Sequence, residues 1–314
     1  MLLLVFCTTL IAQETPKEPG KETNTEPTKE QPKKDVKENL KETTESIIYW
    51  DEEKTKIKLL TNTYKKDGKE IFHGVARSFL ISGQMVIERY FSEGLLDGVE
   101  THFTDKGVKT NVLFWQKGEL KKESTYFTNG TIKAETELKT IEEKNPDSSK
   151  PDLTKRLRHG LETIFYANGK PRVQMHWSED KQNGIETFWW DNGKKKYELT
   201  WKMNMKEGIE SQWFINGELS CITNWINNQA HGEMINYHEN GIKKDRLEWD
   251  HGVMIGERSS WNDKGVLIGN CTIKDGRPFS GTLFDIEAKL ILTFADGRQV
   301  SSKVCDKNGA LKEK

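Results

Sequence analysis

The sequence predicts an all-β protein, in which stacked β-hairpins form one elongated antiparallel sheet after a disordered N-terminal tether. Three observations lead to this prediction. A glycine-led segment returns every 24 residues, each copy has large side chains at the same two places, and Asn-Gly, Asp-Gly or Lys-Gly pairs separate the short apolar segments. A fixed period of this length is typical of repeat proteins, and aromatic-rich segments between such pairs are typical of strands joined by tight turns.

The repeat has eight copies, called units here and numbered by their first residue, which is position 0. They begin at Gly74, Gly98, Lys121, Gly160, Gly184, Gly208, Gly232 and Gly256. The steps from Gly160 to Gly256 are each 24 residues, whereas Lys121 follows Gly98 by 23 residues and replaces the glycine. A glycine at this place leaves room for a neighbouring aromatic ring or permits a positive φ.

Two positions in each unit hold large side chains. Position 5 is always aromatic, with Phe79, Phe103, Tyr126, Phe165, Trp189, Trp213, Tyr237 and Trp261. Position 17 holds Phe91, Trp115, Leu138, Trp177, Trp201, Trp225, Trp249 and Ile273. Because side chains alternate along a strand, we expect positions 1, 3 and 5 to share one face of the sheet.

The segments before the first unit differ in composition. Residues 1–12 are apolar, uncharged and too short for a membrane-spanning helix, so they predict a cleaved export signal. Lipid attachment at Cys7 is the alternative, and the protein is cytoplasmic if the signal interpretation is wrong. Residues 13–46 are rich in Lys, Glu, Pro and Thr and predict a disordered linker. The repeat array is expected over 47–314, with two or three strands before the first unit.

Two parts of the array depart from the period. Between Lys121 and Gly160 the spacing grows to 39 residues, and the extra polar stretch near 139–158 contains two prolines, so we expect a loop there. After Gly256 the copies become degenerate, as expected for terminal repeats that face water on one side.

The net charge limits the classes of partner. The chain carries 48 basic and 49 acidic residues, for a net charge of −1. Nucleic-acid binding needs a basic field, and attraction to anionic membranes needs one as well. The composition therefore predicts no nucleic-acid partner and gives no support for a membrane partner.

The unit G-x-E-x-x-W/F-Y/W-x-N-G-K resembles the MORN-repeat variant family, as in bacterial YwqK-type proteins, which are described as antitoxin components of toxin–antitoxin systems. The resemblance extends from Tyr64 to about Gly309. It implies an array of stacked hairpins, protein interaction, sometimes lipid interaction, and no chemistry.

Candidate chemical groups are few. Position 2 holds Glu100, Glu123, Glu162, Glu186 and Glu210, and a glycoside hydrolase could use two such carboxylates. Because they recur once per hairpin, roughly 9–10 Å apart, we expect a structural or solvated role instead. His73, His159 and His231 precede opening glycines in non-adjacent units and are expected to be turn histidines, not zinc ligands. The sequence contains no Gly-x-Ser-x-Gly, P-loop or Cys-x-x-Cys motif, so we expect no catalytic or cofactor-binding residues.

Three cysteines follow the signal-like segment, namely Cys221, Cys271 and Cys305. Cys221 and Cys271 are two units apart, roughly 20 Å by strand spacing, which is too far for a disulfide. We therefore expect buried free thiols.

A second aromatic stripe lies at position 6 of four consecutive units, with Tyr166, Trp190, Phe214 and His238. We expect it on the face opposite position 5, and two interpretations stay open. Twisting of the sheet can bury part of such a row, or the row is an exposed patch that binds a partner.

The sequence therefore predicts a non-enzymatic, exported protein-interaction scaffold without metal or cofactor. Its partner is an unidentified protein, with a glycan or a membrane surface as further options. The alternatives are a YwqK-like antitoxin component that binds a toxin, and a glycan hydrolase that uses the glutamate row.

Overall fold

The structure is a computed structural model that describes residues 42–146, 150, 152–285, 287–306 and 309–312. These residues form a single antiparallel sheet of 24 strands, which confirms the predicted fold class. None of them lies in a helix long and apolar enough to cross a membrane. The signal-like segment 1–12 and most of the predicted linker lie outside the described residues. The first strand begins at Thr44, shortly before the predicted start of the array.

The first ten strands lead into unit 160. They are β1 (Thr44–Tyr49), β2 (Ile57–Lys66), β3 (Lys69–Phe79), β4 (Met85–Ser92), β5 (Leu95–Leu96), β6 (Gly98–Phe103), β7 (Lys109–Gln116), β8 (Glu119–Tyr126), β9 (Ile132–Glu143) and β10 (Leu153–Phe165). The middle strands are β11 (Pro171–Ser178), β12 (Lys181–Gln182), β13 (Gly184–Trp189), β14 (Lys195–Lys202), β15 (Met205–Lys206), β16 (Gly208–Trp213) and β17 (Leu219–Ile226). The last are β18 (Gln229–Tyr237), β19 (Lys243–Asp250), β20 (Val253–Trp261), β21 (Leu267–Lys274), β22 (Arg277–Asp285), β23 (Leu290–Ala295) and β24 (Arg298–Val304).

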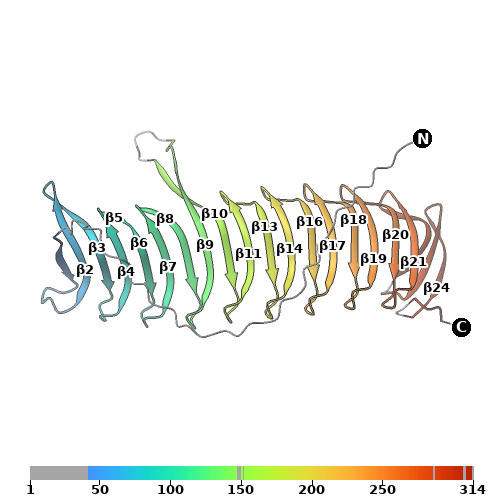
Figure 1. Ribbon diagram of the computed structural model, residues 1–314, viewed down its shortest axis with the longest axis horizontal. Helices are drawn as coiled ribbons and strands as arrows, with labels where there is room; N and C mark the ends of the chain where they lie inside the picture. Colours follow the sequence, from blue (N-terminus) through green and yellow to red (C-terminus); the bar gives the residue numbers. More distant parts are fainter. Residues whose placement is uncertain (1–41, 147–149, 151, 286, 307–308, 313–314) are drawn as a thin grey trace, which may run out of the picture. The chain divides into compact units, whose positions relative to one another are not determined.

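The strands stand side by side in chain order (Figure 1). Between the two end strands, each longer strand pairs antiparallel with the longer strand before it and the longer strand after it, as β13 does with β11 and β14. The two-residue strands β5, β12 and β15 continue the ladders of β4, β11 and β14 past the tight turns. Neighbouring units therefore meet through backbone hydrogen bonds along the whole array.

Two kinds of turn join the strands. One edge carries the Asn-Gly turns, in which the glycine alone has positive φ, as at Gly193 with φ 91°. The other edge carries two-residue turns such as Met203-Asn204, where both residues have positive φ, 50° and 69°. This pattern is that of a type I′ turn, whose twist matches the twist of paired strands.

The asparagine of each Asn-Gly turn links its unit to the next one. Its amide donates to a backbone carbonyl one unit further on, and its side-chain oxygen accepts the N–H of the residue two places later. In unit 184, for example, the Asn192 amide nitrogen lies 3.1 Å from Ile215 O, and the Asn192 side-chain oxygen lies 2.9 Å from Lys194 N. The same links are made by Asn129, Asn168, Asn216 and Asn240. The Asn-Gly pairs in the sequence predict only a turn at these sites, and the ladder along the edge is visible only in the structure.

The opening glycines all have positive φ, but they differ in the space around them. A Cβ at Gly184, where φ is 121°, would lie 3.0 Å from His176 Cβ. At Gly208 φ is 80° and no atom lies within 4 Å of the Cβ position. Room for a neighbour is therefore needed at Gly184, whereas Gly208 is required only for its backbone conformation.

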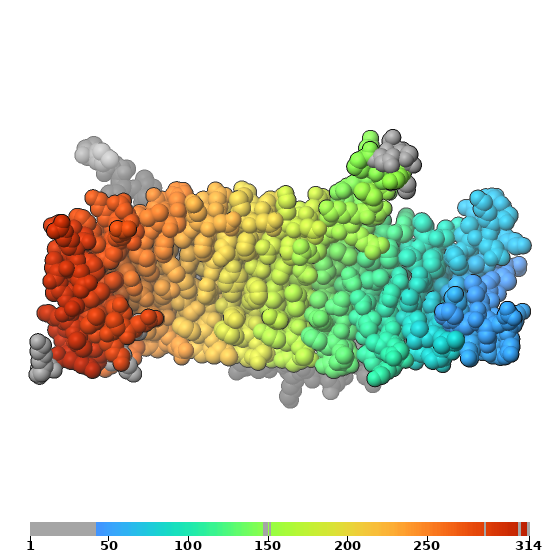
Figure 2. Space-filling model, turned by 180° about the vertical axis from the view of Figure 1, so that it is seen from behind, coloured from blue at the N-terminus to red at the C-terminus, as the bar shows by residue number. Residues whose placement is uncertain are grey.

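The insertion near 139–158 is a paired extension, so the prediction of a loop is wrong for most of it. Strand β9 continues to Glu143 and β10 begins at Leu153, and the two pair from Leu153 with Glu143 to Arg158 with Leu138. The extension projects from one edge of the sheet (Figures 1 and 2). Continued pairing satisfies backbone groups that a loop would leave to water, and the two prolines lie beyond the paired residues.

Candidate binding face

The two faces of the sheet bury different residues. In unit 184 the register pairs Gly184 with Trp201 and Glu186 with Leu199, and residues paired across antiparallel strands point to the same face. We call this the tryptophan face. Leu199 is fully buried there and Glu186 is only 6% exposed. Much of the packing therefore lies on the face that carries position 17.

The opposite face carries positions 1 and 3. Ile185 and Ile209, both at position 1, are 50% and 62% exposed, whereas Thr187 at position 3 is buried. Before position 5 a β-bulge shifts the register between Phe188 and Trp189. Alternation predicted that positions 1, 3 and 5 share this face. The isoleucine at position 1 is nevertheless exposed, because the described residues supply no second layer to cover it.

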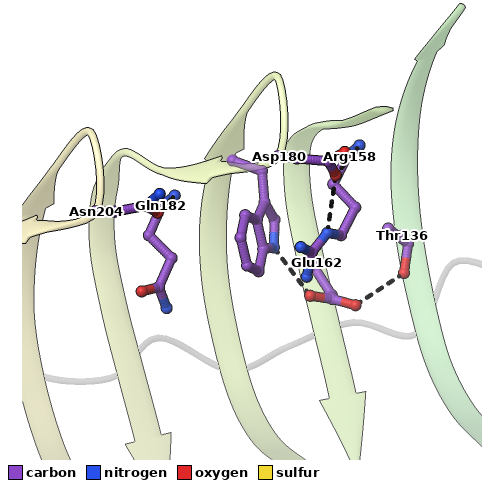
Figure 3. A network of polar contacts seen from close by, with 7 residues as sticks. Thr136, Arg158, Glu162, Asp180, Gln182 and Asn204 are labelled. Atoms are coloured by element: carbon purple, nitrogen blue, oxygen red, sulfur yellow. Dashed lines mark hydrogen bonds and ion pairs between the residues drawn. The ribbon is translucent and has the colours of Figure 1, made fainter. Parts of the chain in front are cut away.

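In units 160 and 184 the position-2 glutamate accepts a hydrogen bond from the position-17 tryptophan of its own unit. Trp177 Nε1 donates to Glu162 at 2.9 Å, and Trp201 Nε1 donates to Glu186 at 2.8 Å. The Thr136 hydroxyl donates to the second oxygen of Glu162 at 3.1 Å (Figure 3). A buried carboxylate is stable only when such donors replace water, so the glutamate row is part of the packing.

Units 208 and 232 lack this bond. Glu210 instead accepts hydrogen bonds from Lys206 and Gln212, and Met234 stands at position 2 of unit 232. The indole nitrogens of Trp225 and Trp249 are buried and have no hydrogen-bond partner within the described residues. A buried N–H without a partner costs about 1–3 kcal/mol. These two units are therefore less well satisfied than units 160 and 184.

Cationic side chains cover several of the rings. The Arg158 guanidinium lies 3.5 Å from the centre of the Trp177 ring, and Lys206 Nζ lies 4.3 Å from that of Trp225. Both residues stand two places before the opening glycine of the unit that contributes the tryptophan. Arg158 also bonds to Asp180, whose carboxylate accepts the backbone N–H of Arg158 at 2.9 Å (Figure 3). Sequence reasoning missed these pairs, although their constant spacing could have suggested them.

Burial changes the acidity of groups on this face. Burial raises the pKa of Glu186 above its ordinary value, against hydrogen bonds from Trp201 and Gln182 and the charge of Lys206, which lower it. Burial, followed by the charges of Glu210 and Glu186, raises the pKa of Tyr197. These shifts have a common origin in the desolvation that close packing imposes.

The position-6 stripe is half-buried and links successive units. Tyr166 Oη donates to Trp189 O at 2.7 Å, Trp190 Nε1 donates to Trp213 O at 3.3 Å, and His238 Nε2 lies 2.9 Å from Trp261 O. Phe214 has no polar atom for such a bond. The stripe is thus neither a core row nor a freely exposed patch, and its partner binding stays a prediction.

Two hollows lie on the tryptophan face beside the stripe. One is lined by Glu186, Phe188, Lys196, Tyr197 and Gln212, and Lys196 Nζ lies 4.3 Å from the centre of the Trp190 ring. The next shares Gln212 and adds Cys221, Trp225, Met234 and Trp249 among its lining residues. Together they form a recess across units 184 to 232 in which apolar rings alternate with amide and charged groups.

The cysteines are buried free thiols, as predicted. Burial raises the pKa of Cys221, Cys271 and Cys305. Because the thiolate is the reactive form, these thiols are poor nucleophiles.

Solved structures align with the chain over most of its length but with low structural similarity. The crystal structure of TcdB2-TccC3 aligns with 86% of this chain at 10% identity and a TM-score of 0.18. The Photorhabdus luminescens Tc holotoxin pore aligns with 85% at 10% identity and a TM-score of 0.18. CbpJ from Streptococcus pneumoniae TIGR4 aligns with 86%, over 94% of its own length, at 13% identity and a TM-score of 0.17. The chain spans 17% and 16% of the length of the first two.

Sequence comparison identifies the repeat. No curated protein is significantly similar to the chain. None of the comparisons supports a YwqK-type or antitoxin assignment. Residues 158–179 and 182–203 match the model of the MORN repeat variant, and these segments contain the two units in which tryptophan and glutamate are bonded.

Proposed function

We propose that this chain is a non-enzymatic scaffold of MORN-variant repeats, which binds a protein partner in the recess on the tryptophan face of units 184 to 232. The recess is the observation that carries the proposal. It combines half-buried aromatic rings with amide and charged groups. Protein interfaces are enriched in tryptophan, tyrosine and arginine and often centre on such partly buried anchors.

The state of the glutamate row favours binding over hydrolysis. Glu162 and Glu186 accept indole hydrogen bonds, and Glu210 is bound by Lys206 and Gln212. A hydrolase needs one carboxylate to protonate the leaving group and a second to attack or to activate water. Carboxylates held in this way are poorly placed for either task, and a net charge of −1 favours a protein partner over a nucleic acid.

Export belongs to the same proposal and rests on the sequence of residues 1–12. A mature N-terminus near Gln13 in a non-cytoplasmic fraction would support export. An acylated Cys7 would instead support a lipoprotein, and an intact N-terminus in the cytoplasm would reject both.

The binding proposal is tested with the full chain as bait. Captured proteins are identified by mass spectrometry, and the affinity of the recovered partner is then measured against two matched double variants. Trp190→Ala with Phe214→Ala removes two rings of the position-6 stripe beside the recess, where Lys196 of the recess lies over Trp190. Ile185→Thr with Ile209→Thr alters the exposed opposite face. Circular dichroism verifies that both variants remain folded.

We expect the first variant to weaken binding by more than about tenfold, since loss of aromatic anchors at an interface commonly costs about 2 kcal/mol or more. The second variant should bind like the parent. The reverse order would reject the tryptophan face as the binding surface. A partner whose toxicity the chain suppresses would favour the antitoxin alternative.

A further inference from the structure

The turn end of unit 232 brings together three side chains of the kinds that bind zinc. His231 immediately precedes Gly232 in β18, Asp250 ends β19, and His251 occupies the following turn. One ligand atom from each lies within 4.8 Å of the others. We propose that these three residues bind a zinc ion.

The repeat itself creates this arrangement. The residue before the opening glycine faces positions 18 and 19 of the same unit, because the tight turn folds those positions back beside it. In unit 74, for example, His73 Nδ1 lies 3.5 Å from the backbone nitrogen of Glu93 at position 19. Of the eight units, unit 232 alone has a histidine or carboxylate at all three places. The ligands are 19 and 20 residues apart, a spacing that resembles no short zinc motif.

The distances suit a small ion. His231 Nδ1 lies 3.3 Å from Asp250 Oδ1, and His251 Nδ1 lies 2.6 Å from the same oxygen. The two imidazole rings are 4.8 Å apart between centres. Zinc at about 2.0–2.1 Å from each ligand in tetrahedral geometry needs donor atoms roughly 3.3 Å apart. The contact with His251 must widen by a fraction of an ångström, which its 61% exposed side chain allows.

The coordination chemistry of His231 supports an ion at this place. Its Nδ1 is buried, and despite its closeness to Asp250 it has no hydrogen-bond partner within the described residues. A buried ring nitrogen without a partner costs free energy that a bound cation would recover. Two imidazoles and one carboxylate favour zinc or a neighbouring transition metal over calcium or magnesium, which prefer oxygen ligands. Three protein ligands also leave a coordination position open to water.

The test is calorimetric titration of ZnCl2 into the full chain, without an affinity tag and after treatment with a chelator. The variants Asp250→Asn and His251→Gln remove ligands at an exposed turn. His159→Gln is the matched control, because His159 has the same place in unit 160 beside Ser178 and Glu179. Circular dichroism verifies folding, and cobalt absorption spectra report whether thiolates take part.

We expect one zinc ion per chain. Each ligand variant should weaken zinc binding by more than about tenfold, because even loss of a residue that hydrogen-bonds to a metal ligand commonly lowers metal affinity 10–100-fold. The control His159→Gln should bind zinc like the parent. The cobalt spectrum should lack thiolate charge-transfer bands. Absence of zinc binding, equal loss in the control, or thiolate bands would each overturn the proposal.

Discussion

Units 160 and 184 share their strand register with units 208 and 232, yet they satisfy their tryptophans differently. In the first pair the indole N–H donates to a position-2 glutamate, and in the second pair it has no partner within the described residues. The cause lies in local sequence differences. In unit 208 the Glu210 carboxylate accepts hydrogen bonds from Lys206 and Gln212, and unit 232 has Met234 in place of the glutamate.

The two pairs of units share the features that define the fold and differ in a hydrogen bond that adds to its stability. Both pairs keep the turn types and the asparagine links between units. The tryptophan–glutamate bond is therefore an addition to a framework of backbone ladders and turn hydrogen bonds. Its loss is expected to lower local stability without changing the register, since each repeat contacts only its neighbours.

The largest effect is expected from the side chain at position 15. Leu199→Ala should cost about 3 kcal/mol, because it empties a fully buried site between Trp201 and Glu186. Thr223→Ala at the same position of unit 208 should cost only about 1 kcal/mol, since a smaller group is lost. Urea denaturation followed by tryptophan fluorescence measures both, and equal losses would show that the two units pack alike.

Replacement of the opening glycine should also cost more stability in unit 184 than in unit 208. Gly184→Ala should cost about 2–3 kcal/mol, because φ of 121° is strained for alanine and the new Cβ would crowd His176. Gly208→Ala should cost about 1 kcal/mol from the backbone term alone, at φ of 80°. Thermal melts of the two variants provide the comparison, and a larger loss at Gly208 would contradict the assigned geometry.

The strands, the tight turns and the order of the hairpins were predictable because the period and the aromatic positions repeat in the sequence. The packed face was not. Alternation shows that Ile185 and Thr187 share a face, but a single-layer sheet has no covered side that hydrophobicity alone identifies. Glu186 looks like a solvated residue until the register places it beside Trp201.

Contacts between distant positions were also hidden. Asn192 bonds to a carbonyl 23 residues later, a link that becomes visible only when neighbouring turns are superposed. The paired extension of β9 and β10 has a polar composition that predicts a loop, although its residues continue both strands. His231 meets Asp250 and His251 through a turn whose geometry no local motif encodes.

Replacement of Glu186 by glutamine should alter the pH dependence of stability. Because burial raises the folded-state pKa of Glu186, the folded state binds more protons than the unfolded chain as pH rises from the ordinary value of 4.5 to that raised pKa. Glu186 therefore lowers the free energy of unfolding of the protein as pH rises across this window. Glu186→Gln still accepts the Trp201 bond and should lack this loss. Melting temperatures across the acidic range that run parallel in the two proteins would refute the shift.

The smallest effect is expected from supplying the missing acceptor in unit 232. Met234→Gln gives Trp249 a neutral oxygen at position 2 and should stabilise the chain by about 1 kcal/mol. Met234→Leu keeps the apolar volume and serves as its control. A gain with leucine that equals the gain with glutamine would assign the effect to packing instead of hydrogen bonding.

A pair of double-mutant cycles tests most directly whether the glutamate row is structural. One combines Glu186→Ala with Trp201→Phe, and the other combines Glu210→Ala with Trp225→Phe. Since hydrogen bonds to charged groups contribute about 1.5–3 kcal/mol, the first cycle should give a coupling energy in that range. The second should give a smaller coupling energy, because no hydrogen bond joins Glu210 and Trp225 and they couple only through Lys206, which contacts both. Equal coupling energies in the two units, or none in unit 184, would contradict the account.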